Sequence, residues 1–214
     1  MYNIHMATPL FVRSCYTLLG SLLTPEKIAR KAKELSYQAV ALVDEKVLSG
    51  AKAFQKACAR EGIKPLFELS FPVEKEGQSV HPFFLAEDDE GYGMLIALSS
   101  RLCLSEGTLP PEEVKDYHSH NLLIFPSDQL PVDLAAEDGD LLQQLQALQT
   151  FYGGFLVGLC DHDQAYNASR DARLRPLLET AGIRTVAFSR TFYAEAEDEE
   201  AFHTAEAIRD KTTL

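Results

Sequence analysis

Two short patterns of acidic and histidine side chains have the spacing that metal-dependent phosphoryl chemistry uses. The tripeptide Asp161–Asp163 (Asp-His-Asp) has the Asp-x-Asp form that can hold two metal ions around a transferring phosphoryl group. The tripeptide His118–His120 (His-Ser-His) would place two imidazoles on one side of an extended strand. The first pattern is also common by chance, and the second lies in a polar stretch typical of an exposed loop. We therefore expect neither to be a metal site.

The rest of the chain offers few other patterns that could do chemistry. The acidic run Glu195–Glu200 precedes an expected helix, where carboxylates complement the positive end of the helix dipole, so we interpret it as a solvated helix start. The sequence contains no glycine-rich phosphate-binding loop and no Gly-x-Ser-x-Gly nucleophile elbow. Its four cysteines are scattered and form no Cys-x-x-Cys pair, which argues against zinc-ribbon and thioredoxin-type sites.

The composition is that of an ordinary globular protein with an acidic excess. The 214 residues carry a formal net charge of −12. Because an acidic surface repels phosphates, we expect no strong DNA binding by this chain alone. No apolar stretch is long enough to span a membrane, and the first residues lack the pattern of a secretory signal. The unpaired cysteines indicate reduced thiols, so we expect a cytoplasmic protein.

Strand and helix signals alternate along the chain. Apolar runs predict strands at 10–13, 38–44, 63–73, 80–86, 122–125, 155–159 and 185–188. Helical spacing and cap signals, such as Thr24-Pro25 at a helix start and Gly62 at a helix end, predict helices between them, and a closing helix follows at 199–210. This order predicts an α/β fold with a parallel sheet covered by helices, in a single domain over residues 1–214. The pattern alone does not separate an open sheet from a closed barrel.

Two segments resemble the PHP (polymerase and histidinol phosphatase) domain that begins the alpha subunit of bacterial DNA polymerase III. They are FVRSCYTLLGS near the start and VAFSRTFY near the end. In that family the first segment reads His-x-His and then Leu-Leu-Asp-Gly, and the second ends Asn-Asp-Val-His-Tyr. The two early histidines fall here on Phe11 and Arg13, the early Asp on Gly20, and the late Asp and His on Arg190 and Phe192. The frame is kept while these metal ligands are replaced.

Further family positions follow in order along the chain. The strand ending Ala-Leu-Thr-Asp-His-Gly in the family keeps its Asp as Asp44, and its liganding His becomes Glu45. The liganding Glu that comes two residues past a Gly in the family is Ser70 here. Two family histidines match His81 and His162. Between residues 101 and 150 the match is loose, and we carry no ligand across there.

The resemblance implies a distorted parallel (β/α) barrel of about seven strands, with these positions gathered at one end. In active members the cluster binds two or three metal ions that activate water for phosphoester hydrolysis. Here Asp44, His81 and His162 could hold at most a single zinc- or manganese-like ion. The fixed positive charges of Arg13 and Arg190 oppose a cluster, so we expect a vestigial pocket with no cofactor and no catalytic residue.

Buried carboxylates that have lost a metal need another counter-charge. The two cations that entered ligand positions, Arg13 and Arg190, come from opposite ends of the sequence, which are neighbours in the implied barrel. A guanidinium is always charged and can bind a carboxylate through two hydrogen bonds. We therefore expect at least one of these arginines to pair with Asp44 or Glu45 as an internal brace.

Three functions remain open from the sequence. The resemblance favours a catalytically silent PHP domain with a structural and docking role in DNA replication. It would be the N-terminal piece of a DNA-directed DNA polymerase (a nucleotidyltransferase), with the palm and the rest of that subunit, and a proofreading exonuclease subunit, as partners. The first alternative is a metal-dependent phosphoesterase or proofreading 3'-5' exonuclease with a reduced metal site. The second is an unrelated α/β barrel enzyme, which is the weakest because the matched segments recur in order. For the isolated chain we expect no enzymatic activity.

Overall fold

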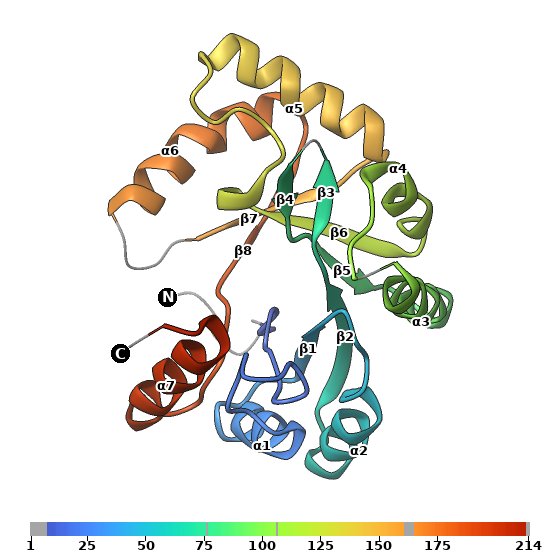
Figure 1. Ribbon diagram of the computed structural model, residues 1–214, viewed down its shortest axis with the longest axis vertical. Coiled ribbons are helices and arrows are strands. Elements are labelled where there is room, and N and C mark those ends of the chain that lie inside the picture. Colours follow the sequence, from blue (N-terminus) through green and yellow to red (C-terminus); the bar gives the residue numbers. More distant parts are fainter. Residues whose placement is uncertain (1–7, 76, 106, 161–164, 213–214) are drawn as a thin grey trace. The chain divides into compact units, whose positions relative to one another are not determined.

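The computed structural model describes residues 8–75, 77–105, 107–160 and 165–212. The chain forms two compact units (Figure 1). We call Met1–Leu69 together with Arg190–Leu214 the terminal unit, and Ser70–Ser189 the central unit. Each unit is described by itself, and the single domain expected over residues 1–214 stays a prediction.

The terminal unit contains the helices and strands at the two ends of the sequence. They are α1 (Pro25–Glu34), β1 (Ala39–Glu45), α2 (Ala51–Glu61), β2 (Lys64–Ser70, whose last residue belongs to the central unit), the 3-10 turn η4 (Ala196–Asp198) and α7 (Glu199–Asp210). Helix α1 begins as expected, because the Thr24 side chain accepts a hydrogen bond from the Lys27 N–H at 3.2 Å and Pro25 follows it. Helix α2 ends at Gly62, whose φ of 71° is in the left-handed region.

The core of the terminal unit lies between β1 and the two helices α1 and α2, which lie side by side (Figure 1). Five consecutive residues of β1, Val40–Asp44, are buried, as expected of a strand covered on both faces. Its apolar side chains pack with Ile28 and Ala32 of α1 and with Phe54 and Cys58 of α2. This packing holds the carboxyl end of β1, where Asp44 and Glu45 lie, in a fixed position.

The first strand expected at 10–13 is wrong in extent, because only Val12 makes strand-type pairing. Phe11 has a φ of 62°, and this left-handed conformation interrupts an extended run. Val12 forms parallel bridges to both Leu42 of β1 and Thr191. The two ends of the sequence therefore meet within the terminal unit.

The central unit contributes the neighbouring strands β5-β6-β7-β8 to the sheet and contains a separate hairpin, β3-β4. Its strands are β3 (Val73–Lys75), β4 (Gln78–Val80), β5 (Phe83–Ala86), β6 (Asn121–Pro126), β7 (Leu156–Leu159) and β8 (Arg184–Ala187). Its helices and 3-10 turns are α3 (Asp89–Leu104), α4 (Pro111–Val114), η2 (Lys115–Tyr117), η3 (Ser127–Gln129), α5 (Asp138–Tyr152) and α6 (Ala165–Thr180). Helices α5 and α6 lie side by side (Figure 1).

Two expected strands are divided by proline. The strand expected at 63–73 becomes β2 and β3, separated at Pro72, and the strand expected at 80–86 becomes β4 and β5, separated at Pro82. Proline has no backbone N–H to donate to a strand ladder, so it ends each strand. The second division creates the β3-β4 hairpin, which the sequence did not predict.

The sheet is rich in parallel strands, but it is not parallel throughout. Strands β6, β7 and β8 are parallel, whereas β5 pairs with β6 in the antiparallel direction. The chain after β5 closes directly on the start of β6, since the Glu87 N–H donates to the His120 carbonyl at 3.1 Å. A Cβ at Gly91 would lie 2.1 Å from that carbonyl oxygen, so glycine permits this close approach.

The overall class is mixed α/β, as expected. Closure of the strands into a barrel of about seven strands stays a prediction. Among the described residues, no helix has both the length and the apolar character needed to cross a membrane.

Candidate functional site

The terminal unit gathers most of the family ligand positions. Residue 13 and residues 190–192 are joined by backbone hydrogen bonds, because the Arg13 N–H donates to the Thr191 carbonyl at 3.0 Å and the Thr191 N–H donates to the Phe11 carbonyl at 3.2 Å. The Val43 N–H donates to the Val12 carbonyl at 2.9 Å, which brings β1 to the same place. Seven positions expected to form the vestigial pocket thus come from three neighbouring segments: Phe11, Arg13, Gly20, Asp44, Glu45, Arg190 and Phe192.

Asp44 is held by hydroxyl and backbone donors. Its side chain accepts hydrogen bonds from the Ser14 N–H at 3.1 Å, from the Ser14 hydroxyl at 2.9 and 2.8 Å and from the Thr17 hydroxyl at 3.0 Å. Asp44 is 2% exposed. Burial raises the pKa of this carboxyl, and the bonds from Ser14 and Thr17 oppose that rise. The sequence analysis missed these two hydroxyl partners.

Arg13 and Glu45 form the ion pair that was expected as a brace. Arg13 Nη1 lies 3.7 Å from Glu45 Oε2, and the two side chains are 15% and 30% exposed. The guanidinium also lies over the Phe192 ring, 5.6 Å from its centroid. Burial lowers the pKa of Arg13, Glu45 raises it, and the like charges of Arg190 and Arg209 lower it further. The predicted pairing is therefore confirmed for Arg13 with Glu45, and its role as a brace stays a prediction.

The two phenylalanines replace imidazoles by rings that cannot bind a metal. Phe11 is 1% exposed and belongs to the core. Phe192 stacks on Phe202 of α7, with ring centroids 5.0 Å apart and an interplanar angle of 7°. Phe11 thus fills part of the core, and Phe192 packs against the closing helix α7.

A polar cavity of about 330 Å³ adjoins the ion pair. Arg13, Lys46 and Arg209 contribute three cations to its lining, and Glu45 contributes one carboxylate. Within the described part of the chain, no group of three or more histidine, cysteine, aspartate or glutamate side chains could hold a metal ion. The excess of fixed positive charge opposes cation binding in this cavity.

Glu68 of β2 is a buried carboxyl that sequence reasoning missed. Its side chain is 1% exposed, and its Oε2 accepts a hydrogen bond from the Phe11 N–H at 3.2 Å. Its Oε1 has no hydrogen-bond partner among the described residues. Burial raises the pKa of Glu68 to about 8. The signal was present: Glu68 stands where the family has the Gly that precedes its liganding Glu.

Two expected site residues belong to the central unit. Ser70 is buried, and the His81 N–H donates to Gln129 Oε1 at 2.9 Å. His162 lies outside the described residues, as do Asp161 and Asp163. The gathering of Ser70, His81 and His162 with the terminal-unit positions stays a prediction.

The two other patterns from the sequence serve structural purposes. The stretch His118–His120 is a turn before β6, as expected, and His120 pairs with Asp88 at 2.9 Å and with Glu90 at 3.2 Å. The acidic run before α7 does more than cap a helix. Asp198 and Glu195 each lie 2.7 Å from a lysine Nζ of α1, so the run joins α7 to α1.

Comparison with known proteins places this arrangement in a family context. A model of the PHP domain matches residues 10–146. The chain is 29% identical over 205 residues to the DNA polymerase III subunit alpha of Bacillus subtilis, covering 92% of this chain and 18% of that protein. It is 28% identical over 216 residues to the subunit of the same name from Treponema pallidum, covering 90% and 18%. The chain thus spans less than a fifth of the length of these relatives.

Solved structures agree in fold. A protein from Bifidobacterium adolescentis, assigned to the metal-dependent phosphoesterases, matches with a TM-score of 0.63 at 11% identity over 87% of this chain and 88% of that one. An amidohydrolase from Chromobacterium violaceum, solved with bound sulfate and no metal, matches with a TM-score of 0.60 at 12% identity over 92% and 96%. At such low identity the likeness concerns the fold alone.

Proposed function

Because the chain belongs to the PHP domain family, we propose that it is a catalytically silent PHP domain with a structural and docking role in DNA replication, within a DNA polymerase III alpha subunit. The observation that carries this proposal is the Arg13–Glu45 ion pair at two positions where the family has metal-ligating histidines. Family membership removes the alternative of an unrelated α/β barrel enzyme.

Side chains of the terminal unit connect the first loop to β1, as shared metal ligation would. Arg13 bridges the first loop to the carboxyl end of β1 through Glu45, and Ser14 and Thr17 bridge the same loop to Asp44. These contacts are charge-assisted or buried, so they are stronger than ordinary surface pairs. These protein groups thereby hold the loop against β1.

The described donors fit a metal poorly. Three of the hydrogen bonds to Asp44 reach Oδ1 and one reaches Oδ2, so its lone pairs are largely engaged. Binding a cation there would require Ser14 and Thr17 to give up their acceptor, next to the positive charge of Arg13. These groups favour a closed polar network over a hydrolytic site.

The alternative is a metal-dependent phosphoesterase or proofreading 3'-5' exonuclease with one zinc or manganese ion at Asp44, His81 and His162. It is favoured by the retention of these three family ligands and by the fold shared with a protein assigned to the metal-dependent phosphoesterases. In that case the ion would activate water, and the three residues would hold it.

The proposal includes partners. The first partner is the rest of the polymerase subunit, because this chain matches only 18% of the length of the Bacillus subtilis relative. A proofreading exonuclease subunit would supply the nuclease activity that this domain lacks. The net charge of −12 supports binding to proteins over DNA, and a cytoplasmic location accords with replication.

Metal titration tests the silent-site proposal. We expect millimolar manganese or zinc to change the melting temperature of the chain little, and elemental analysis of metal-soaked protein to find no stoichiometric ion. An ion at 100 times its dissociation constant would add about 2.7 kcal/mol, a shift of several degrees for a chain of this size. A saturable rise of that size, with phosphoester hydrolysis that His81→Ala abolishes, would favour the phosphoesterase.

A further inference from the structure

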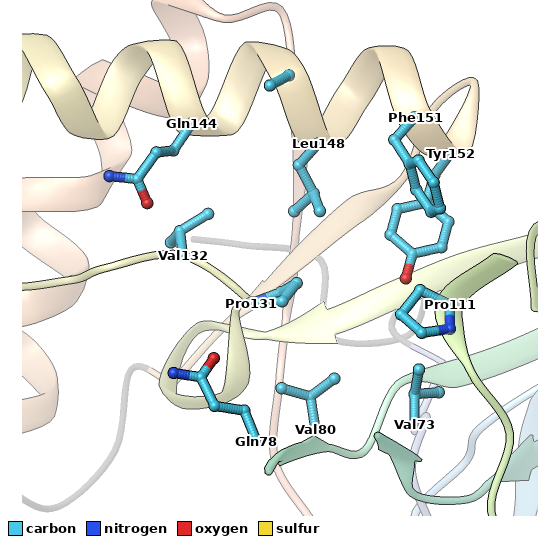
Figure 2. A pocket seen from close by; sticks show the side chains of 11 residues that line it. Val73, Gln78, Val80, Pro111, Pro131, Val132, Gln144, Leu148, Phe151 and Tyr152 are labelled. Carbon is cyan, nitrogen blue, oxygen red and sulfur yellow. The ribbon is translucent and has the colours of Figure 1, made fainter. Parts of the chain in front are cut away.

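The central unit has an open apolar hollow of about 530 Å³ between α5 and the β3-β4 hairpin (Figure 2). This volume is within the range of ligand sites in proteins. Leu148, Phe151 and Tyr152 of α5 form one wall, and Val73 and Val80 of the hairpin form the other. Pro111 and Pro131 lie between the two walls, as Figure 2 shows.

Helix α5 presents a second apolar face to this hollow, in addition to the face that it buries in the core. Leu141 and Leu145 are fully buried on the core side. Gln144, Leu148 and Phe151 recur at spacings of four and three residues, which places them on one face of the helix, and all three line the hollow. Phe151 is 38% exposed, so a large aromatic ring remains available for contact.

Three polar groups in the lining have unused hydrogen-bonding capacity within the described residues. Gln144 Oε1 accepts from the Asp133 N–H at 2.8 Å, which fixes its amide and leaves the NH₂ group to donate. The Tyr152 hydroxyl and the Gln78 amide have no hydrogen-bond partner in the described part of the chain, and Figure 2 shows the hydroxyl directed toward Pro111. Spaced donors and acceptors on an aromatic and proline-lined surface suit the backbone of an extended peptide.

Three acidic residues, Glu112, Asp133 and Asp140, lie close in the sequence to residues that line the hollow, and we call them its acidic rim. Glu112 follows Pro111 and helps to raise the pKa of Tyr152 to about 12, after the larger effect of burial. Asp133 follows Val132, and Asp140 lies one helical turn before Gln144 on α5 and is exposed. The nearby cation Lys115 lies over the Phe151 ring, 5.5 Å from its centroid. The central unit as a whole has 19 acidic and seven basic residues.

We propose that this hollow is a docking groove for an extended peptide segment of a partner protein, with an apolar or proline-containing centre that contacts Phe151, Tyr152 and Pro111 and with lysine or arginine on its flanks. The inference rests on the docking role proposed above, and it names the docking face and the chemistry of the partner. We choose this occupant because its basic flanks would complement the acidic residues next to the hollow. A second copy of the chain would bring the same acidic excess, and a small apolar molecule would leave the acidic rim without a counterpart.

Selection from a phage-displayed peptide library on the full chain tests the groove. We expect enriched peptides that combine an apolar or proline-rich centre with basic flanks. Synthetic copies should bind by fluorescence polarisation, more weakly as salt increases. Leu148→Glu should weaken binding at least about tenfold, because it places a charge in the apolar wall. Gln144→Glu, a nearly isosteric change at the edge, should strengthen the binding of basic peptides.

Matched controls show whether peptide binding depends on this groove and on its acidic rim. Leu104→Glu changes an 82%-exposed side chain on α3 that does not line the hollow, and it should leave peptide affinity unchanged. A peptide with the same centre and glutamate flanks should not bind. Failure to enrich any peptide, or enriched peptides that Leu148→Glu still binds equally well, would overturn the groove. Self-association that Leu148→Glu abolishes would replace the partner peptide by a second copy and would equally refute it.

The outcomes also separate this inference from the proposed function. A chain that stays silent toward metals and phosphoesters but binds no peptide would refute the groove and leave the silent-domain proposal standing. A chain that binds basic peptides and also hydrolyses phosphoesters with a bound metal would keep the groove and refute the silent site.

Discussion

The terminal and central units differ in net charge and in where their acidic groups lie. The terminal unit has 13 acidic and 13 basic residues, whereas the central unit has 19 acidic and seven basic residues and so carries the entire net charge of the chain. In the terminal unit Asp44 is buried, and its carboxylate is satisfied by hydroxyl donors of the same unit. In the central unit, Glu112, Asp133 and Asp140 lie close in the sequence to residues that line an apolar hollow. The terminal unit thus satisfies the Asp44 carboxylate within its own fold, whereas the central unit has an excess of acidic groups and an exposed apolar surface.

The largest expected effect that tests this contrast is the response of the terminal unit to pH through Glu68. Burial raises the folded-state pKa of Glu68 from 4.5 to about 8. The folded state therefore binds a proton more tightly than the unfolded state does. The unfolding free energy that this group contributes is fully present below about pH 4.5 and is lost as the pH rises toward 8. The loss is on the order of 4 kcal/mol by linkage.

Urea unfolding at a series of pH values between 4.5 and 9 measures this effect. We expect Glu68→Gln to show a shallower decline than the parent chain over the interval from 4.5 to 8, because its side chain cannot ionise. Glu61→Gln, at the end of α2, changes a carboxyl of the same kind outside the core and serves as the control. Parallel declines in all three chains would show that Glu68 is ionised or solvated in the folded state.

The second effect concerns the brace between the first loop and β1. Arg13→Ala removes the partner of a half-buried Glu45, so we expect a loss of about 2 kcal/mol, between the values for exposed and for buried pairs. Arg13→Met keeps apolar contact with the Phe192 ring and removes only the charge, so it separates packing from the ion pair.

Chemical denaturation of Glu45→Gln and of the double variant Arg13→Met with Glu45→Gln completes a thermodynamic cycle. A coupling energy near zero would mean that the two side chains stabilise the fold independently, and the terminal unit would then have no brace in place of a metal. Lys46 and Arg209 line the same cavity as Arg13 and Glu45, so removing the Arg13 charge should also change the electrostatic potential at these two cations.

How far the sequence could predict this protein depends on the range of the interactions. Local signals predicted the start of α1 at Pro25, the end of α2 at Gly62 and the bounds of α7, because caps and helical spacing act within a few residues. The reversed direction of β5 was missed, because it is seen only in the pairing of β5 with β6, two strands that α3, α4 and η2 separate in the sequence. Chain order alone carries no information on that pairing.

The candidate site also has features that the sequence predicted and features that it missed. The exchange of ligands for Arg13 and Glu45 was visible from the family frame. The need for a counter-charge predicted that Arg13 or Arg190 would pair with Asp44 or Glu45, and the structure pairs Arg13 with Glu45. The donors to Asp44 were missed, because a turn with the Thr17 N–H bonded to the Ser14 carbonyl at 3.1 Å is what directs both hydroxyls at the carboxylate. Serine and threonine are too common in loops for their types alone to indicate this network.

The smallest expected effect lies in the central unit, where charges are exposed. The pKa of His120 is raised chiefly by its hydrogen bond to Asp88, with further contributions from the charges of Asp88 and Glu90. Because this pair is in contact with solvent, salt should screen the charge effects and lower the pKa toward its ordinary value. The raised pKa of Glu68 comes from burial, so salt should leave it nearly unchanged. An NMR titration of His120 at low and at high salt, repeated in Asp88→Asn, tests this difference.

Asparagine is an equally good N-cap for α3, so the Asp88→Asn variant should lower the pKa of His120 while the helix stays intact. A His120 pKa that falls in Asp88→Asn but does not respond to salt would show that the central unit also shields its charge pairs from solvent, and the contrast between the two units would fail at this site.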